Sequence, residues 1–158
     1  KEEGILPNFD NKDNISLASM KKYMSGIVIN DDKKKRNALE KGKQVGLKPN
    51  DPAFMTVSLS GGNAQKVILA RWMSTDATVM IFDEPTKGID IGAKADIYLL
   101  MEKMAAEGIA IIMVSSELTE VMGMSDRILV MSDGKITGEL MKDEFSEESI
   151  LNYTVEEN

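Results

Sequence analysis

The sequence contains neither cysteine nor histidine. Without cysteine, disulfides and thiolate metal sites are excluded, and the composition agrees with a reducing compartment. Without histidine, the chain lacks the most common general base and the most common metal ligand. Any catalytic or metal-binding site must therefore be built from other side chains.

Aromatic residues, positive charge and long apolar runs are also scarce. Aromatics make up 5% of the chain and there are 12 methionines, so we expect methionine and isoleucine to fill the core. The net charge of −7 argues against nucleic acid as a main partner, because neutralising phosphates requires clustered Lys and Arg. The one basic run, "KKKR" at residues 33–36, favours a solvated helix face.

No apolar run reaches the length that spans a membrane, and no signal peptide opens the chain. The chain of 158 residues suits one domain or slightly more. Because residue 1 is a lysine and not an initiator methionine, we expect the chain to be part of a longer protein.

The first half of the chain has a helical pattern. Residues 12–46 carry an apolar stripe followed by a charged helix that ends near residues 42–46. Residues 47–58 contain two prolines and predict a loop, and a helix should follow over residues 63–74. The stripe consists of Ile15, Leu17, Met20 and Met24.

The second half alternates strands and helices. Two continuous apolar runs, residues 78–83 and 109–116, predict buried strands, and residues 91–108 between them predict a helix that Gly108 ends. The pattern predicts an α/β fold with a mostly parallel sheet that is covered on both faces. The buried face of the helix should carry Ile97, Leu100, Met101 and Met104.

Three further elements complete the predicted chain. A short helix over residues 116–124 should be capped by Ser115 or Ser116, and a β-hairpin should turn at Asp133-Gly134. Residues 146–153 predict a closing helix.

Two adjacent carboxylates lie at the end of the strand predicted over residues 78–83. Asp83 is suited to a bound Mg²⁺, and Glu84 is suited to polarising a water for attack on a γ-phosphate. The alternative is that both residues merely end a strand that Pro85 terminates.

A serine and two glycines precede the helix predicted at residue 63. Such a turn lets a phosphate approach backbone N–H groups at the positive end of a helix. The alternative is a capping serine, Ser60, in a glycine turn formed by Gly61 and Gly62. The chain contains no GxxxxGK loop followed by Ser or Thr, which grips phosphates in many nucleotide-binding proteins.

In their order, "LSGGNAQKV", a helix and "VMIFDEPTKGID" resemble the ATP-binding cassette family. This resemblance implies a partial P-loop NTPase domain, with residues 1–75 in the helical signature subdomain and 76–158 in the RecA-like core. It assigns the signature motif to Leu59, Ser60, Gly61, Gly62 and Asn63, the Walker B strand to residues 79–83, the Mg²⁺ ligand to Asp83, the catalytic glutamate to Glu84 and the D-loop to Asp90. Ser116 stands where the family has its switch histidine.

The pattern "GNAQK…TKGIDIGAK" resembles the second ATPase domain of tandem importers for simple sugars such as ribose, galactose or xylose, although Ala64 replaces a usual glutamine. The resemblance implies ATP and Mg²⁺ as cofactors. It implies a partner ATPase domain in the same polypeptide and an integral membrane sugar permease as partners. The subunit would be cytoplasmic and peripheral on the inner face of the membrane.

Within the resemblance, the predicted residues serve two nucleotides. Asp83, Glu84 and Ser116 would serve the domain's own site, whereas the signature would reach the nucleotide on the partner domain. Because the phosphate loop is absent, we expect the isolated chain to be inactive. We also expect residues 79–83 to pair directly with residues 110–114, or with an edge lent by another copy in a homo-oligomer.

Two alternatives remain open. The domain can be a coupling module that responds to its partner's nucleotide and hydrolyses little, which Ser116 favours and Glu84 disfavours. It can also be a non-transport cassette ATPase that acts on DNA or ribosomes, which the acidic balance disfavours.

Overall fold

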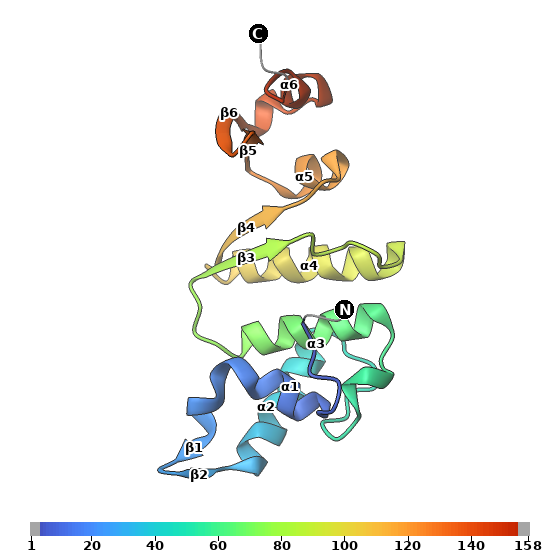
Figure 1. Cartoon of the computed structure of the whole chain (residues 1–158), viewed down its shortest axis with the longest axis vertical. Helices are drawn as coiled ribbons and strands as arrows, with labels where there is room; N and C mark the ends of the chain where they lie inside the picture. Colours follow the sequence, from blue (N-terminus) through green and yellow to red (C-terminus); the bar gives the residue numbers. More distant parts are fainter. Residues whose placement is uncertain (1–3, 155–158) are drawn as a thin grey trace. The chain divides into compact units, whose positions relative to one another are not determined.

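The computed structural model describes residues 4–154, which form two compact units. The first contains the residues up to Met80 together with Thr86–Ile111, and the second contains Ile81–Pro85 together with the residues from Ile112 onward. Figure 1 labels the elements of both units. Among the helices of the described residues, none is long and apolar enough to cross a membrane.

The first unit is a helical assembly. Its largest fully buried apolar side chains are Ile15, Val67, Ile97 and Met104. Its elements are α1 (Asn11–Ser16), the 3-10 helix η1 (Leu17–Tyr23), β1 (Met24–Ser25), β2 (Val28–Ile29), α2 (Asp31–Gln44), the 3-10 helix η2 (Thr56–Ser58), α3 (Gly61–Met73) and α4 (Ile91–Ala106).

Side-chain caps set the starts of these four α-helices. Asp10, Asn30, Ser60 and Asp90 have extended backbones, and each side chain accepts a hydrogen bond from the N–H three residues later. Each cap satisfies an N–H group that has no partner inside the helix. The four residues expected on the buried face of α4 are all buried, which confirms that prediction.

A buried polar network joins the start of the chain to α3. The side chain of Asn14 is fully buried and bonds to Leu6, Phe9 and Asp10 through backbone atoms and to Thr56 through its hydroxyl. Arg71 of α3 is also buried, and its guanidinium donates to the carbonyl and the side-chain oxygen of Asn14 and to the carbonyl of Gly4. Burial lowers the pKa of Arg71 by desolvating its charge.

The predicted continuous helical pattern over residues 12–46 is wrong in its middle. A short antiparallel hairpin, β1–β2, separates η1 from α2. Leu17 and Met24, two members of the predicted apolar stripe, are 42% and 45% exposed. The basic run is solvated at three of its four positions, but Lys34 is buried and pairs with Asp13.

Strand β3 (Val79–Asp83) pairs directly with β4 (Ala110–Val114), which confirms the expected pairing. Ala110 N–H donates to Thr78 C=O at 2.9 Å, and Glu84 N–H donates to Val114 C=O at 2.8 Å, so both strands run in the same direction. The expectation that both faces would be covered is wrong, because Ile81, Ile112 and Val114 are more than half exposed.

The second unit continues with α5 (Leu118–Met124), β5 (Arg127–Ser132), β6 (Lys135–Met141), the 3-10 helix η3 (Lys142–Glu144) and α6 (Glu147–Asn152). The predicted hairpin is confirmed: β5 and β6 are antiparallel, and Asp133 and Gly134 have φ of 48° and 76°. Both residues of a type I′ turn need positive φ, which explains why this dipeptide marks the turn.

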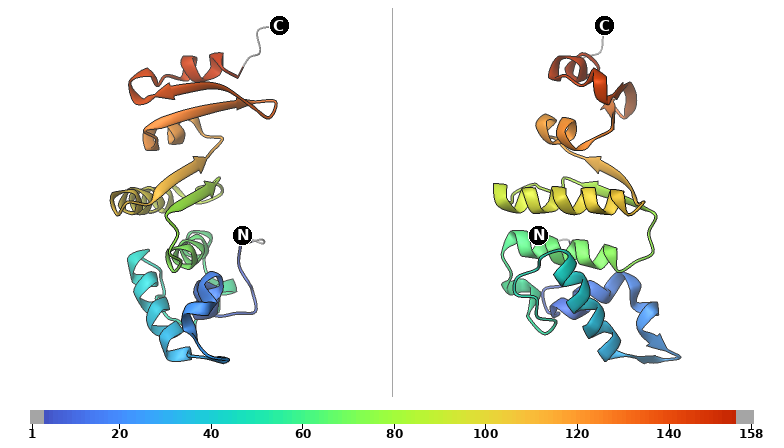
Figure 2. Two further views of the ribbon diagram at one scale, coloured as in Figure 1. Left: turned by 90° about the vertical axis from the view of Figure 1, so that its left-hand side faces the viewer. Right: turned by 180° about the vertical axis from the view of Figure 1, so that it is seen from behind.

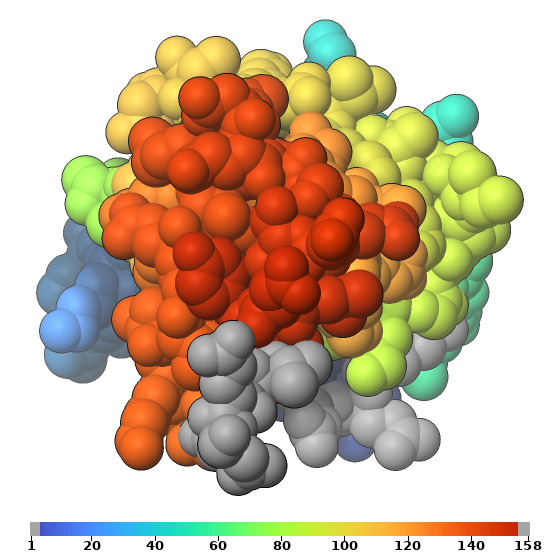
Figure 3. Space-filling model, turned by 90° about the horizontal axis from the view of Figure 1, so that it is seen from above, coloured from blue at the N-terminus to red at the C-terminus, as the bar shows by residue number. Residues whose placement is uncertain are grey.

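The core of this unit lies between the hairpin and α6. It consists of Ile128, Val130, Leu140 and Ile150. Figure 3 shows one face of the unit, formed by residues toward the C-terminal end of the chain.

The predicted cap of α5 is wrong. Its N-cap residue is Glu117, which makes no side-chain capping bond. Ser115 instead accepts a hydrogen bond from the Glu117 N–H, just before the helix begins.

Candidate functional site

The start of α3 presents the serine–glycine turn as the sequence predicts. The helix begins at Gly61, two residues earlier than expected, because Ser60 is its N-cap. Ser60 is exposed and Gly61 is half-buried. The Ser60 hydroxyl accepts from the backbone N–H of Asn63 at 3.4 Å and from its side-chain amide at 3.1 Å.

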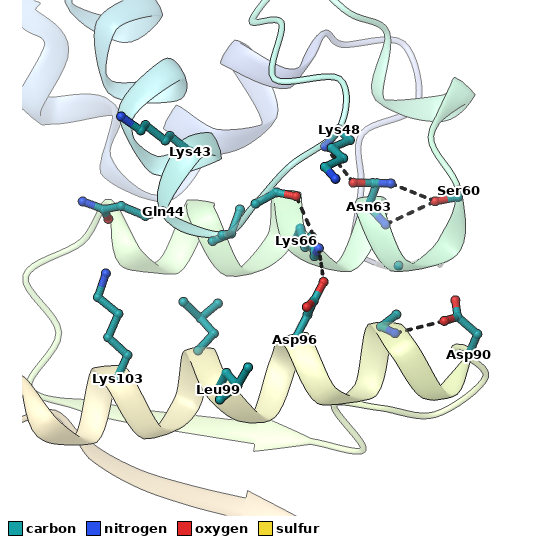
Figure 4. Close-up of a pocket in the computed structure, with 15 residues that line it drawn as sticks. Lys43, Gln44, Lys48, Ser60, Asn63, Lys66, Asp90, Asp96, Leu99 and Lys103 are labelled. Atoms are coloured by element: carbon teal, nitrogen blue, oxygen red, sulfur yellow. Dashed lines mark hydrogen bonds and ion pairs between the residues drawn. The ribbon is translucent and has the colours of Figure 1, made fainter.

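A cleft of about 640 Å³ lies in the first unit beside this turn. Ser60, Gly62 and Asn63 line it together with Asp90, so four of the predicted nucleotide-binding residues surround one cavity (Figure 4). The other two, Leu59 and Gly61, are not among its lining residues, and Leu59 is buried in the core.

Asp90 has a structural task at the rim of this cleft. Its carboxylate accepts from the N–H of Ala93 at 2.9 Å and so caps α4. A Cβ added to Gly62 would lie 3.0 Å from the Cβ of Ala93. Glycine at position 62 therefore permits α3 and α4 to approach closely at the cleft.

Sequence reasoning missed an ion pair in the middle of the cleft. Lys66 Nζ lies 2.6 Å from Asp96 Oδ2 and also donates to the carbonyl of Gly46 at 3.3 Å (Figure 4). Lys66 follows Asn63 by three positions on α3, so these two residues share a helix face. The partner Asp96 lies on α4, and the pairing depends on how α3 packs against α4, which the sequence of neither helix specifies.

Asn63 also positions the loop after α2. Its side-chain oxygen accepts from the backbone N–H of Lys48 at 2.8 Å. The same side chain thus bonds to the cap of α3 and to the loop opposite, which fixes the shape of the mouth of the cleft.

In the second unit, the predicted catalytic pair is in contact. Ser116 donates its backbone N–H to Glu84 Oε1 at 3.1 Å, and within residues 4–154 the second carboxylate oxygen has no hydrogen-bond partner. Glu84 has φ of 48°, a left-handed conformation that costs energy for a residue with a Cβ. Its backbone N–H bonds to Val114, so the end of β4 fixes both the backbone and the side chain of Glu84.

Asp83 ends β3 with an exposed side chain. Among the described residues, no group of three or more acidic side chains forms a ready metal cage. A single exposed carboxylate nevertheless fits Mg²⁺, which commonly takes one or two protein carboxylates and completes its shell with water and phosphate.

The family of the chain follows from its sequence matches. Residues 1–87 match the family described as ABC transporter. The chain belongs to this family.

Related sequences are named for sugar import. The chain is 46% identical over 151 residues to the putative ribose/galactose/methyl galactoside import ATP-binding protein 1 of Rhizobium etli, covering 96% of the chain and 29% of that protein. It is 47% identical over 156 residues to the arabinose import ATP-binding protein AraG of Pseudomonas savastanoi pv. phaseolicola, covering 98% of the chain and 31% of that protein. The chain thus spans less than a third of the length of these relatives.

Solved structures support the fold. The dimeric bacterial ABC transporter cassette MJ0796 matches with a TM-score of 0.76 at 23% identity, over 92% of this chain and 62% of that one. The ADP conformation of a second ATP-binding cassette matches with a TM-score of 0.76 at 20% identity, over 94% and 63%. The fold is that of an ATP-binding cassette, represented here in part.

Proposed function

We propose that this chain belongs to the ATP-hydrolysing subunit of an ABC sugar importer, as part of its second nucleotide-binding domain. The names of the relatives support sugar import as the process. The observation that carries the ATPase role is the hydrogen bond from the Ser116 N–H to Glu84, which orients a carboxylate at the end of a strand.

In this proposal, Glu84 is the group that polarises the attacking water. Its Oε1 is held by Ser116, and its other oxygen stays available to accept a proton or a hydrogen bond from water. Asp83 next to it would hold Mg²⁺, which supplies charge neutralisation at the phosphates when bound. ATP and Mg²⁺ are thus the proposed cofactors.

Ser116 contributes to this arrangement through its backbone. The bond to Glu84 comes from the main-chain N–H, so it does not depend on the side chain at position 116. This supports a role in which Ser116 positions the carboxylate and does not carry a proton, as a histidine would.

The signature residues serve a different nucleotide in this proposal. Ser60, Gly62 and Asn63, with Asp90 at the rim, line a cleft in the first unit, at the N-terminal end of a 13-residue helix. Such a helix end favours anions, and the partner ATPase domain would supply the nucleotide. An integral membrane sugar permease would be the second partner.

A coupling module that hydrolyses little ATP is the second candidate. It is favoured because the Ser116 side chain supplies no imidazole at the position of the family's switch histidine. The two candidates differ in whether Glu84 matters for turnover.

The experiment measures ATP turnover and sugar uptake by the complete importer, with the other composite site disabled. We expect Glu84→Gln to lower turnover by about 10²-fold or more, the usual contribution of a general base. Ser116→Ala should change turnover little, because the backbone donor remains. Glu102→Gln, on the exposed face of α4, is the matched control. Unchanged turnover in Glu84→Gln would favour the coupling module.

A further inference from the structure

Hairpin β1–β2 has apolar residues at its apex. Met24 pairs with Ile29 and Ser25 with Val28, so Gly26 and Ile27 form a two-residue turn. Gly26 has φ of 62°, as the first turn residue of a type II′ hairpin requires. The turn needs this glycine but does not need isoleucine next to it, since polar residues are common at such positions.

The side chains at this apex are unusually exposed. Ile27 is 95% exposed, Val28 is 65% exposed and Ile29 is 48% exposed. Figures 1 and 2 show the hairpin projecting from the helices of the first unit in every view. Clustered exposed apolar side chains usually mark a surface that binds another phase or molecule.

The segments on either side of the hairpin are basic, although the protein as a whole has a net charge of −7. Lys21 precedes β1, and Lys33, Lys35 and Arg36 lie in the first two turns of α2. Within residues 4–154, none of these four cations pairs with a carboxylate, and Asp32 is the one acid of residues 21–36 without a cationic partner.

Lys33 ties this charge to the base of the hairpin. Its ammonium group donates to the carbonyl of Lys22 at 2.7 Å, and the N–H of Asn30 donates to the carbonyl of Tyr23 at 2.7 Å. The two ends of the hairpin are therefore held together, with positive charge beside them and apolar side chains at the far end.

We propose that hairpin β1–β2 binds the surface of a bilayer that contains anionic lipids. Ile27 and Val28 enter the boundary between headgroups and acyl chains, while Lys21, Lys33, Lys35 and Arg36 contact the phosphates. An apolar insertion combined with flanking cations is the arrangement that binds peripheral proteins to anionic membranes. This inference does not depend on the proposed ATPase role.

Charge favours a bilayer over the other occupants. A second copy of the same surface would bring like charges together, which opposes association. Nucleic acid would satisfy the cations but would leave the isoleucine and valine in water. An anionic bilayer is complementary to both features.

Flotation of the 158-residue chain with lipid vesicles tests the proposal. We expect binding to vesicles of phosphatidylcholine mixed with phosphatidylglycerol, weaker binding to phosphatidylcholine alone, and loss of binding as rising salt screens the cations. Ile27→Asp and Val28→Asp should each weaken binding by about tenfold or more. Lys35→Glu should weaken binding to the anionic vesicles only.

Val57→Asp is the matched control for Val28→Asp. Val57 lies in η2 of the same unit and is 62% exposed, close to the 65% of Val28. Circular dichroism should show that all variants fold alike, since each changed side chain is exposed. The proposal is overturned if the chain fails to float with anionic vesicles, or if Val57→Asp weakens binding as much as Val28→Asp.

Discussion

The buried side chain of Asn14 joins three segments that are distant in the sequence: the loop before α1, Thr56 at the start of η2, and helix α3. It accepts from the Leu6 N–H and from Arg71, and it donates to three carbonyl groups and to Thr56. An asparagine in a helical pattern usually indicates an exposed position or a cap, so its full burial could not be read from the sequence.

We expect Asn14→Ala to lower the free energy of unfolding by about 2–5 kcal/mol, because it leaves buried donors and acceptors unpaired at about 1–3 kcal/mol each. Asn8→Ala, at an exposed position, should change stability little. Urea denaturation of both variants measures the difference. Equal stability of the two variants would show that water replaces the network around Asn14.

The ion pair of Asp31 with Lys12 predicts a dependence of stability on pH. The hydrogen bond from Lys12 lowers the pKa of Asp31 below its usual 3.8, and the same bond raises the pKa of Lys12 above its usual 10.5. The ion pair therefore stabilises the folded state at pH values between 3.8 and 10.5. It is lost as the pH falls through the lowered pKa of Asp31, and again as the pH rises through the raised pKa of Lys12.

Asp31→Asn should thus be less stable than the wild type near neutral pH, and the difference should vanish in acid. Asp32→Asn is the control, because Asp32 lies in the same first turn of α2 but forms no ion pair within residues 4–154. Thermal unfolding over a series of pH values checks both. A difference that persists well below pH 3.8 would contradict the pairing.

At the scale of elements, the helices that the sequence predicts are those marked by capping residues and by the spacing of apolar residues. A helix after the serine–glycine turn is predicted from Ser60, Gly61 and Gly62, although α3 begins two residues earlier than expected. The buried face of α4 follows from the spacing of its apolar residues. These signals lie within one helix, so they need no knowledge of tertiary contacts.

The hairpin β1–β2 could not be predicted from the sequence because its strands are only two residues long and their side chains are exposed. Apolar residues there continue a helical spacing, and only Gly26 points to a turn. The exposure of one face of β3 and β4 could not be predicted either. Continuous apolar runs predict burial on both faces, but burial depends on what packs against the sheet.

The candidate site also combines residues that the sequence could indicate with contacts between elements that it could not. The resemblance assigns Ser60, Gly62 and Asn63 to the signature and Asp90 to the D-loop, and the structure places all four around one cleft. The pairing of Lys66 with Asp96 depends on how α3 packs against α4, which no single segment specifies. Glu84 likewise combines a positive φ with a bond from its N–H to Val114, a contact between two strands that the local sequence does not specify.

Strand β6 contacts Tyr153, the residue after α6, and this contact between elements gives a testable prediction. A Cβ on Gly138 of β6 would overlap the ring of Tyr153, which follows α6. Gly138→Ala should therefore displace the ring and destabilise the second unit by about 1–3 kcal/mol, the usual cost of overpacking.

Gly123→Ala is the matched control. Gly123 lies within α5, and no atom lies within 4 Å of the position that an added Cβ would take. Alanine there should be neutral or stabilise the helix by about 0.5–1 kcal/mol. Chemical denaturation of both variants, with near-ultraviolet dichroism to follow the tyrosine environment, tests the contrast. Equal effects of the two substitutions would show that Tyr153 moves away freely.

At the scale of the whole molecule, the sequence lacks a phosphate loop. It contains no GxxxxGK stretch followed by Ser or Thr, and the pairs Gly42-Lys43 and Gly134-Lys135 lack the required neighbours. Affinity for a triphosphate depends mainly on the backbone N–H groups and lysine of that loop. In the proposed site, Asp83 and Glu84 would add negative charge close to the phosphates.

The lysine in the middle of the cleft does not replace the loop. Lys66, in the middle of the cleft, is already paired with Asp96 at 2.6 Å. Micromolar affinity requires about 8 kcal/mol of binding free energy, far more than the roughly 0.3–2 kcal/mol that a helix end contributes to holding an anion. We therefore expect the 158-residue chain neither to bind MgATP tightly nor to hydrolyse it. Calorimetry with MgATP checks this, with the complete importer subunit as positive control. A dissociation constant in the low micromolar range for the chain alone would mean that the nucleotide site lies elsewhere in these residues.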